Sequence, residues 1–142
     1  MNYITIEQAI EIHDLTIEIS GGGESGVLDT GKLESVLEHI RNDDYYPTFE
    51  EKLAHLFFCA CNFHCFVDGN KRIALALGAQ FLIFNGYIFI AKIFLQEMEN
   101  ISYHVAAGKI DKDLLRNIIS ELLNEGQISD GMKLEIFNAI QD

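Results

Sequence analysis

The chain has 142 residues, of which 49% are hydrophobic and 23% are charged, as expected for one soluble globular domain with a core of its own. Ten Lys and Arg residues face 22 Asp and Glu residues, which gives a formal charge of −12. Such an excess of negative charge opposes nonspecific attraction to nucleic acid and to anionic membranes. We therefore expect neither as a partner.

The cysteines and the amino terminus favour a cytoplasmic protein. Cys59, Cys61 and Cys65 are odd in number and close together, which suits free thiols in a reducing compartment better than a disulfide framework. Residues 1–5 contain no basic segment before an apolar stretch, so we predict no signal peptide.

Hydrophobic periodicity and capping residues predict a mostly helical chain. Capping-box patterns at residues 5–8 and 48–51 each open a helix, and Asp29 or Thr30 caps another. Asp111 caps a helix that continues to Leu122. In chain order, the predicted helices cover about residues 5–20, 30–40, 48–63, 70–84, 95–107, 111–122 and 132–140.

Two uncharged stretches lie on either side of the Asn85-Gly86 turn. Residues 73–91 carry no charge, but the Asn85-Gly86 turn leaves about 13 helical residues, fewer than the roughly 20 that span a bilayer. We therefore predict a buried core helix that ends at this turn. Residues 87–90 are aromatic and β-branched, which predicts an extended connection.

Residues 64–72 gather chemically active side chains directly before the apolar run that starts at Ile73. This placement puts them at the N-terminus of a predicted helix, where unsatisfied backbone N–H groups and the positive end of the helix dipole favour anions. Gly69 would let the main chain approach a phosphate closely. An ordinary helix–loop–helix junction is the competing interpretation, but the order and placement of the polar residues argue against it.

Each polar side chain of this cluster suits phosphate chemistry. His64 can accept a proton from an attacking hydroxyl near neutral pH. Asp68 can hold Mg²⁺, which prefers one or two carboxylates together with nucleotide phosphates. Asn70, Lys71 and Arg72 can bind phosphate oxygens.

The cluster resembles the signature of the Fic/Doc family, His-x-Phe-x-Asp/Glu-Gly/Ala-Asn-Gly/Lys-Arg, and matches it at every signature position. Lys71 stands where adenylyl-transferring members carry a second glycine, and Leu75 stands where they carry a second arginine. Both residues point to the death-on-curing (Doc) branch. Cys65 occupies a position that is usually proline, a departure without a chemical role in the family.

The resemblance implies an all-α fold, a Fic/Doc-type helical bundle with a short extended flap. It also implies an ATP- and Mg²⁺-dependent kinase toxin that transfers the γ-phosphate to a protein hydroxyl, a threonine of elongation factor Tu. The implied catalytic residues are His64, Asp68, Lys71 and Arg72, with Gly69 and Asn70 also binding phosphate and Asp68 holding the metal. An antitoxin partner is expected. Adenylyl transfer and a non-catalytic binding role remain as alternatives.

By the same resemblance, residues 41–47 form the flap, a segment beside the active site that aligns the target by strand addition. Tyr45 and Tyr46 would then contact the target; an ordinary polar loop is the alternative. We expect a Fic/Doc domain over residues 1–123 and a C-terminal helical extension over residues 124–142. That extension could pack on the body, swap to a partner chain or lie near the active site, and the oligomeric state stays open.

Overall fold

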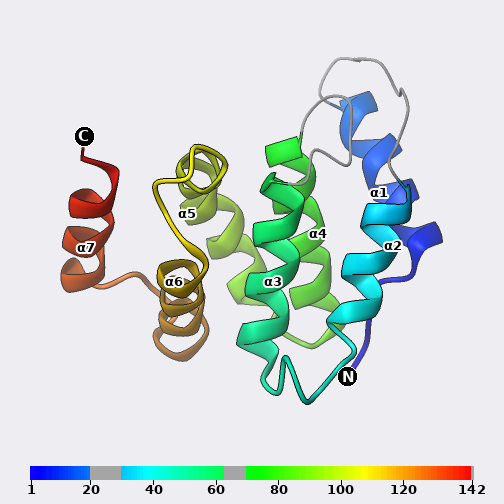
Figure 1. Cartoon of the computed structure of the whole chain (residues 1–142), viewed down its shortest axis with the longest axis horizontal. Coiled ribbons are helices and arrows are strands. Elements are labelled where there is room, and N and C mark those ends of the chain that lie inside the picture. The colour runs from blue at the N-terminus through cyan, green and yellow to red at the C-terminus, as the bar shows by residue number, and fades with distance from the viewer. Residues whose placement is uncertain (20–29, 63–69, 142) are drawn as a thin grey trace.

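The computed structural model describes residues 1–19, 30–62 and 70–141, without the side chains of Ile17, Asn70 and Lys71. Within these residues the chain forms seven helices and no strand, which confirms the all-α prediction (Figure 1). The helices are α1 (Ile6–Ile19), α2 (Thr30–His39), α3 (Phe49–Asn62), α4 (Asn70–Phe84), α5 (Ile88–Ala106), α6 (Lys112–Glu125) and α7 (Asp130–Ile140).

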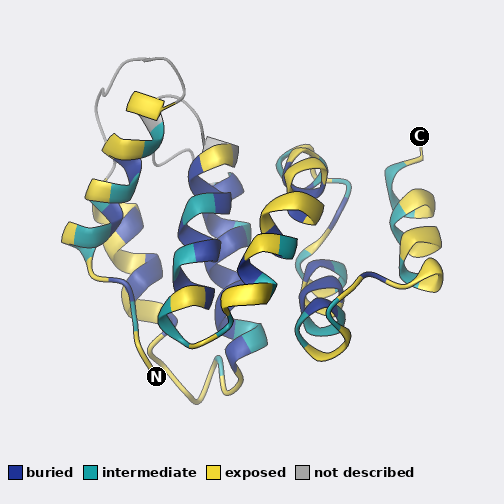
Figure 2. Cartoon of the chain, turned by 180° about the vertical axis from the view of Figure 1, so that it is seen from behind, coloured by how far each residue is buried: buried dark blue, intermediate teal, exposed yellow. Residues whose placement is uncertain are grey.

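Helices α3 and α4 run through the middle of the bundle (Figures 1 and 2). The second half of α3 is apolar on every side, and Leu53, Leu56 and Phe57 are fully buried. Helix α5 packs closely on α4 because Gly78 has no side chain: a Cβ atom there would lie only 2.6 Å from the ring of Phe94. Helices α3 and α4 therefore form the central pair of the bundle.

The predicted helix starts are formed by the expected side chains. The backbone N–H of Thr5 donates to Oε1 of Gln8 at 2.9 Å, and the N–H of Gln8 donates back to Oγ1 of Thr5 at 3.1 Å. At α6, Oδ1 of Asp111 accepts from the N–H of Leu114 at 2.8 Å. Helix α2 begins at Thr30, while Asp29 lies outside the described residues.

The prediction that residues 87–90 form an extended connection is wrong. Gly86 adopts the left-handed conformation (φ 88°) and turns the chain, after which α5 begins at Ile88 rather than near Leu95. Ile88 and Phe89 are 66% and 88% exposed. Strand preference expresses packing on a sheet surface, and the described residues contain no sheet to pack against, so the helical continuation prevails.

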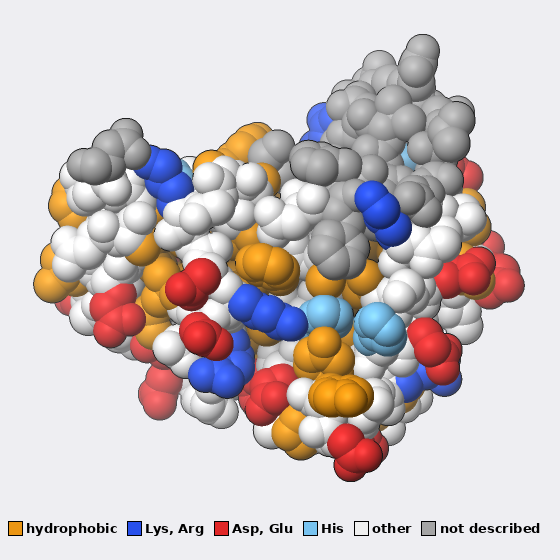
Figure 3. Space-filling view, viewed as in Figure 1, with side chains coloured by type: hydrophobic (Ala, Val, Ile, Leu, Met, Phe, Trp, Pro, Cys, Tyr) orange, Lys and Arg blue, Asp and Glu red, His pale blue; other side chains and the backbone are white. Residues whose placement is uncertain are grey.

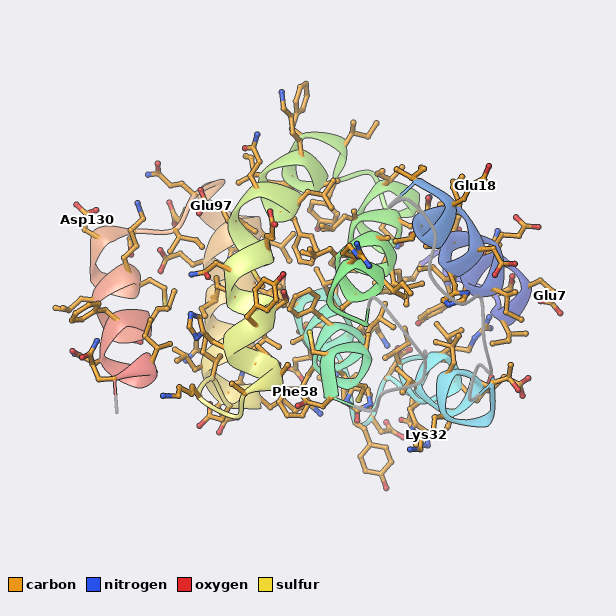
Figure 4. All side chains as sticks on the ribbon, turned by 90° about the horizontal axis from the view of Figure 1, so that it is seen from above. Glu7, Glu18, Lys32, Phe58, Glu97 and Asp130 are labelled. Carbon is orange, nitrogen blue, oxygen red and sulfur yellow. The ribbon has the colours of Figure 1, made fainter. Side chains whose placement is uncertain are left out.

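Helix α7 confirms the predicted C-terminal helix and lies on the body of the molecule. Met132, Ile136 and Ile140 are half-buried against the core, whereas Leu134 and Phe137 are exposed. In two views α7 stands beside α5 and α6, at the opposite end of the molecule from α1 and α2 (Figures 1 and 4). Across the described residues, no helix has the length and apolar character needed for a membrane span.

Candidate active site

The predicted phosphate-binding cluster connects the two central helices. Helix α3 ends at Asn62 and α4 begins at Asn70, so the predicted placement at the start of a helix is confirmed. Residues 63–69 lie outside the described residues, and they include His64, Asp68 and Gly69. Asn70 and Lys71 are described only as the first two residues of α4.

Within the predicted cluster, Arg72 is the residue whose side chain the structure describes. It lies in the first turn of α4 and is exposed to solvent. The backbone N–H groups of this turn point along the helix axis without intrahelical partners, and the helix dipole is positive there. A guanidinium group in that position adds to the positive potential. An anion is the ligand that such a helix start favours.

The N-terminus of a second helix lies at the same end of the bundle. Helix α2 begins at Thr30, at the same end of the bundle as the start of α4 (Figure 1), and Lys32 lies exposed in its first turn (Figure 4). The positive ends of two helix dipoles therefore face the same region. In a chain with 22 acidic residues, this end is suited to a negatively charged ligand.

The residues that follow the cluster anchor α4 in the core. Ile73, Ala74 and Leu77 have no exposed surface, so the first turns of α4 are held on their inner side. Leu75 is also buried, at 8% exposure. The position where adenylyl-transferring relatives carry an arginine therefore presents an apolar side chain inside the protein and no cation to a ligand.

The structure does not bring Tyr45 and Tyr46 to this end of the bundle. Residues 41–48 precede Phe49, the first residue of α3, whereas the cluster follows its last residue. A helix of 14 residues separates these ends by about 20 Å. The segment forms turns, in which Oδ1 of Asn42 accepts from the backbone N–H of Asp44 at 2.9 Å and of Tyr45 at 3.2 Å.

The flap role of Tyr45 and Tyr46 stays a prediction, and the structure describes how the two side chains are placed. Tyr45 is 76% exposed, and Tyr46 stacks on the ring of His55 with centroids 4.4 Å apart. Tyr46 thus reaches only the middle of α3. The contact between Tyr46 and His55 holds the 41–48 segment on the bundle.

Sequence reasoning missed the polar cluster around His55. This residue lies on the buried part of α3 with 9% of its surface exposed, and it contacts Tyr46, Cys59 and Lys112. Burial, followed by the nearby charges of Lys112 and His39, lowers its pKa to about 4. Figure 3 shows histidine side chains gathered beside a cationic one in the middle of this face. The one sequence signal was a histidine within an otherwise apolar helix.

Lys52 is a second buried polar residue without a signal in the sequence. Its side chain is 1% exposed, and its Nζ donates to the carbonyl of Ile40 and to Oδ1 of Asp43, each at 2.7 Å. These bonds tie the beginning of α3 to the end of α2 and to the following loop. Among the described residues, no group of three His, Cys, Asp or Glu side chains could hold a metal ion.

A family comparison agrees with this arrangement. A sequence model described as the Fic/DOC family matches residues 3–82, more than half of the chain. The chain belongs to the Fic/Doc family. The matched residues include α1 to α3, the complete cluster and most of α4, so the Fic/Doc match covers the central helices and the segment that joins them.

Two relatives belong to the Doc branch of the Fic/Doc family by name. The chain is 33% identical over 99 residues to the protein Toxin Doc of Mycolicibacterium smegmatis, covering 67% of this chain and 76% of that protein. It is 26% identical over 132 residues to Protein kinase doc of Escherichia phage P1, covering 89% of this chain and 100% of that protein. Both similarities support a toxin of the Fic/Doc family.

Proposed function

We propose that this Fic/Doc protein is a Doc-type kinase that transfers the γ-phosphate of ATP to a hydroxyl group of a target protein. The observation that carries the proposal is the complete signature at the start of α4, with Lys71 in place of a glycine. The buried Leu75 supports it, because that position offers no cation for the adenylyl-transfer arrangement. The phage P1 relative is named a protein kinase, which agrees with this choice.

In the proposed reaction, His64 removes the proton from the target hydroxyl as its oxygen forms a bond with the γ-phosphorus. The bond between the γ-phosphorus and the bridging oxygen breaks, and ADP leaves. The backbone N–H of Gly69 and the side chains of Asn70, Lys71 and Arg72 stabilise the charge on the transferring group. Asp68 would hold Mg²⁺, which neutralises phosphate charge when bound.

The partners follow from the same proposal. Both relatives carry the name Doc, and one is called a toxin, so we expect an antitoxin that keeps the protein inactive. We propose elongation factor Tu, modified on a threonine, as the first target to test. The helix dipoles of α2 and α4 would favour the ATP phosphates at the shared end of the bundle.

Mass spectrometry of a defined target tests this proposal. Purified elongation factor Tu is incubated with the protein, ATP and Mg²⁺, and its intact mass and modified residue are determined. We expect a mass increase of one phosphate on a threonine with the parent protein, and none with His64→Ala. The variant Lys92→Ala, which changes an exposed lysine of α5, serves as the matched control and should act as the parent does.

Other products would give different answers. An added AMP would overturn the kinase assignment in favour of adenylyl transfer. No addition, together with normal ATP binding measured by calorimetry, would favour a non-catalytic binding role or a different target. A general base contributes roughly 10²-fold or more, so an equal rate with His64→Ala would remove His64 from the mechanism.

A further inference from the structure

A cavity lies where the 41–48 segment, the first half of α3 and the start of α6 meet; we call it the α3–α6 cavity. Its volume is about 240 Å³. A water molecule takes about 30 Å³ in the liquid, so the cavity has room for a small polyatomic anion. The 41–48 segment contributes Tyr45 and Tyr46 to its lining, and α6 contributes Lys112 and Arg116. The proposed catalytic cluster follows the opposite end of α3, so the two sites are separate.

Lys112 is a cation without a carboxylate partner in the described part of the chain. It is half-buried, and its ammonium group donates a hydrogen bond to Nδ1 of His55 at 2.7 Å. The same nitrogen lies 5.2 Å from the ring centroid of Tyr46. Two of its three N–H donors thus have no acceptor among the described residues. Withdrawing an ammonium group from water costs free energy that a neutral imidazole ring only partly offsets.

A chain of hydrogen bonds from Lys112 ends on a donor that lines the α3–α6 cavity. Because the ammonium group can only donate, Nδ1 of His55 accepts and the ring carries its proton on Nε2. Nε2 lies 3.3 Å from the hydroxyl oxygen of Tyr46, which accepts and leaves its own hydrogen to donate elsewhere. Burial, followed by the nearby Cys59, raises the pKa of Tyr46, so the hydroxyl keeps this hydrogen at neutral pH. No described residue accepts it.

Arg116 adds a second cation, one helical turn after Lys112. Its guanidinium group is exposed and forms no ion pair among the described residues. Residues four positions apart lie on one face of a helix, so the two positive charges repel each other. Glu51 and Asp113 also line the cavity, but neither forms an ion pair with Lys112 or Arg116. Figure 3 shows cationic side chains beside the histidines in the middle of this face.

We propose that the α3–α6 cavity binds a phosphate group, either as the free ion or as a monoester on a partner molecule. The phosphate oxygens would accept from the ammonium group of Lys112, the guanidinium group of Arg116 and the hydroxyl group of Tyr46. Its negative charge would neutralise both cations. A carboxylate offers fewer oxygens and a single charge, so it would leave more of these donors unused. This inference goes beyond the proposed transfer reaction and does not depend on it, since none of the three residues belongs to the catalytic cluster.

Nuclear magnetic resonance of the full-length protein with isotope-labelled histidine tests the site. The protein is titrated at neutral pH with inorganic phosphate, and with sodium chloride at equal ionic strength as the control. The ring signals of His55 report the cavity alone, because the proposed catalytic cluster lies beyond the other end of α3. We expect these signals to shift and saturate with phosphate and to stay in place with chloride, because an anion on Lys112 changes the field at the ring.

Three variants change the affinity in different directions. Arg116→Ala leaves the contacts of His55 intact and should weaken phosphate binding about ten-fold. Asp113→Asn removes a negative charge from the lining and should tighten binding, an outcome that a purely structural role would not give. The double variant Lys92→Ala/Lys133→Ala removes two exposed cations of α5 and α7 and should retain the parent's affinity. Circular dichroism verifies that each variant is folded.

Further titrations distinguish the source of the phosphate group. Phosphothreonine that binds more tightly than inorganic phosphate, while threonine does not bind, would support a monoester on a partner molecule; the reverse order would support the free ion. Acetate that binds as tightly as phosphate would overturn the choice of ligand.

Two other results would overturn the site itself. Equal shifts with phosphate and chloride would mean that the His55 signals respond to ionic strength. The same affinity in the parent and in Arg116→Ala, or an equal loss in Arg116→Ala and in Lys92→Ala/Lys133→Ala, would mean that the cavity's own cations do not bind the anion.

Discussion

The ammonium nitrogen of Lys112 lies 2.7 Å from Nδ1 of His55, although 57 positions separate the two residues in the sequence. An ammonium group can only donate, so Nδ1 accepts, and the ring is neutral with its proton on Nε2. Nε2 faces the hydroxyl of Tyr46 at 3.3 Å. One histidine thus connects α6, α3 and the loop between α2 and α3.

This arrangement predicts acid sensitivity of the fold. The pKa of His55 is about 4 in the folded protein, below the value near 6.5 of an unfolded histidine. Between these values the unfolded chain binds the extra proton, so stability falls as the pH falls from about 6.5 to 4. The contribution of His55 amounts to up to about 3 kcal/mol, measured as the free energy of unfolding in urea at a series of pH values.

The variants His55→Leu and His39→Gln separate this effect from general acid denaturation. His55→Leu should remove most of the slope between pH 6.5 and 4. His39→Gln changes an exposed histidine on α2 whose charge is the smallest of the three causes that lower the pKa of His55, so it should leave most of that slope in place. If the two variants retain the same slope, His55 is not the responsible group.

Lys52→Met should destabilise the fold although it replaces a charge by an apolar group. The substitution leaves the carbonyl of Ile40 and the carboxylate of Asp43 without their donor. Burial alone would lower the pKa of Lys52, but hydrogen bonds to Asp43 and Tyr3 outweigh it and raise this pKa, so the charged form is stabilised. We expect a loss of about 2–4 kcal/mol in urea unfolding.

The exposed Lys92 of α5 provides the comparison for this substitution. Lys92→Met should change stability by less than about 0.5 kcal/mol. Similar losses for Lys52→Met and Lys92→Met would show that the buried bonds of Lys52 contribute nothing specific.

Gly78→Ala tests the close packing of α4 on α5. The new methyl group would lie 2.6 Å from the ring of Phe94, which is itself fully buried and edge-on to Phe57. We expect a net loss of about 1–3 kcal/mol from overpacking. Gly131→Ala is the matched control in α7, where the nearest atom stands 3.9 Å away; there alanine should be neutral or stabilise by up to about 1 kcal/mol. If both Gly78→Ala and Gly131→Ala raise the free energy of unfolding, the close packing of α4 on α5 at Gly78 would be contradicted.

Removing α7 should leave the transfer rate unchanged. The helix lies at one end of the molecule beside α5 and α6, whereas α4 runs through the middle, and α7 buries no residue completely (Figure 1). A chain that stops after Ile128 keeps that buried side chain. It loses the half-buried contacts of Met132, Ile136 and Ile140, and the hydrogen bonds from Lys109 Nζ to the carbonyl of Ile140 and from the N–H of Ser129 to Glu121. Its rate of target modification should equal that of the full chain. A clear increase in rate would instead identify α7 as an inhibitory element.

Local patterns in the sequence were sufficient for most of the helices. The Thr5–Gln8 pattern and Asp111 form the predicted caps, because a cap depends on residues three positions apart. The start of α5 was missed, because the aromatic and β-branched residues 87–90 were weighed without knowing that the described residues contain no sheet for them to pack on.

For the candidate site, the sequence predicted the residue types of the cluster and the helix that follows it. It did not predict how the neighbouring segments pack. The start of α4 at Asn70 follows from the apolar run after it. The place of Tyr46 depends on His55 and Lys112, and that of the preceding loop depends on Lys52 and Asp43. Such contacts between distant positions leave no periodic signal, so the sequence did not predict how the 41–48 segment packs on α3 and α6.

The most direct test of the central claim follows the phosphates of ATP. The protein and its His64→Ala variant are each incubated with a bacterial lysate and ATP labelled at either the α- or the γ-phosphate. The kinase account predicts label on protein from the γ-position only, and with the parent only. Label transferred from the α-position would contradict it and make the protein an adenylyltransferase. Equal labelling by parent and variant would contradict the role given to His64.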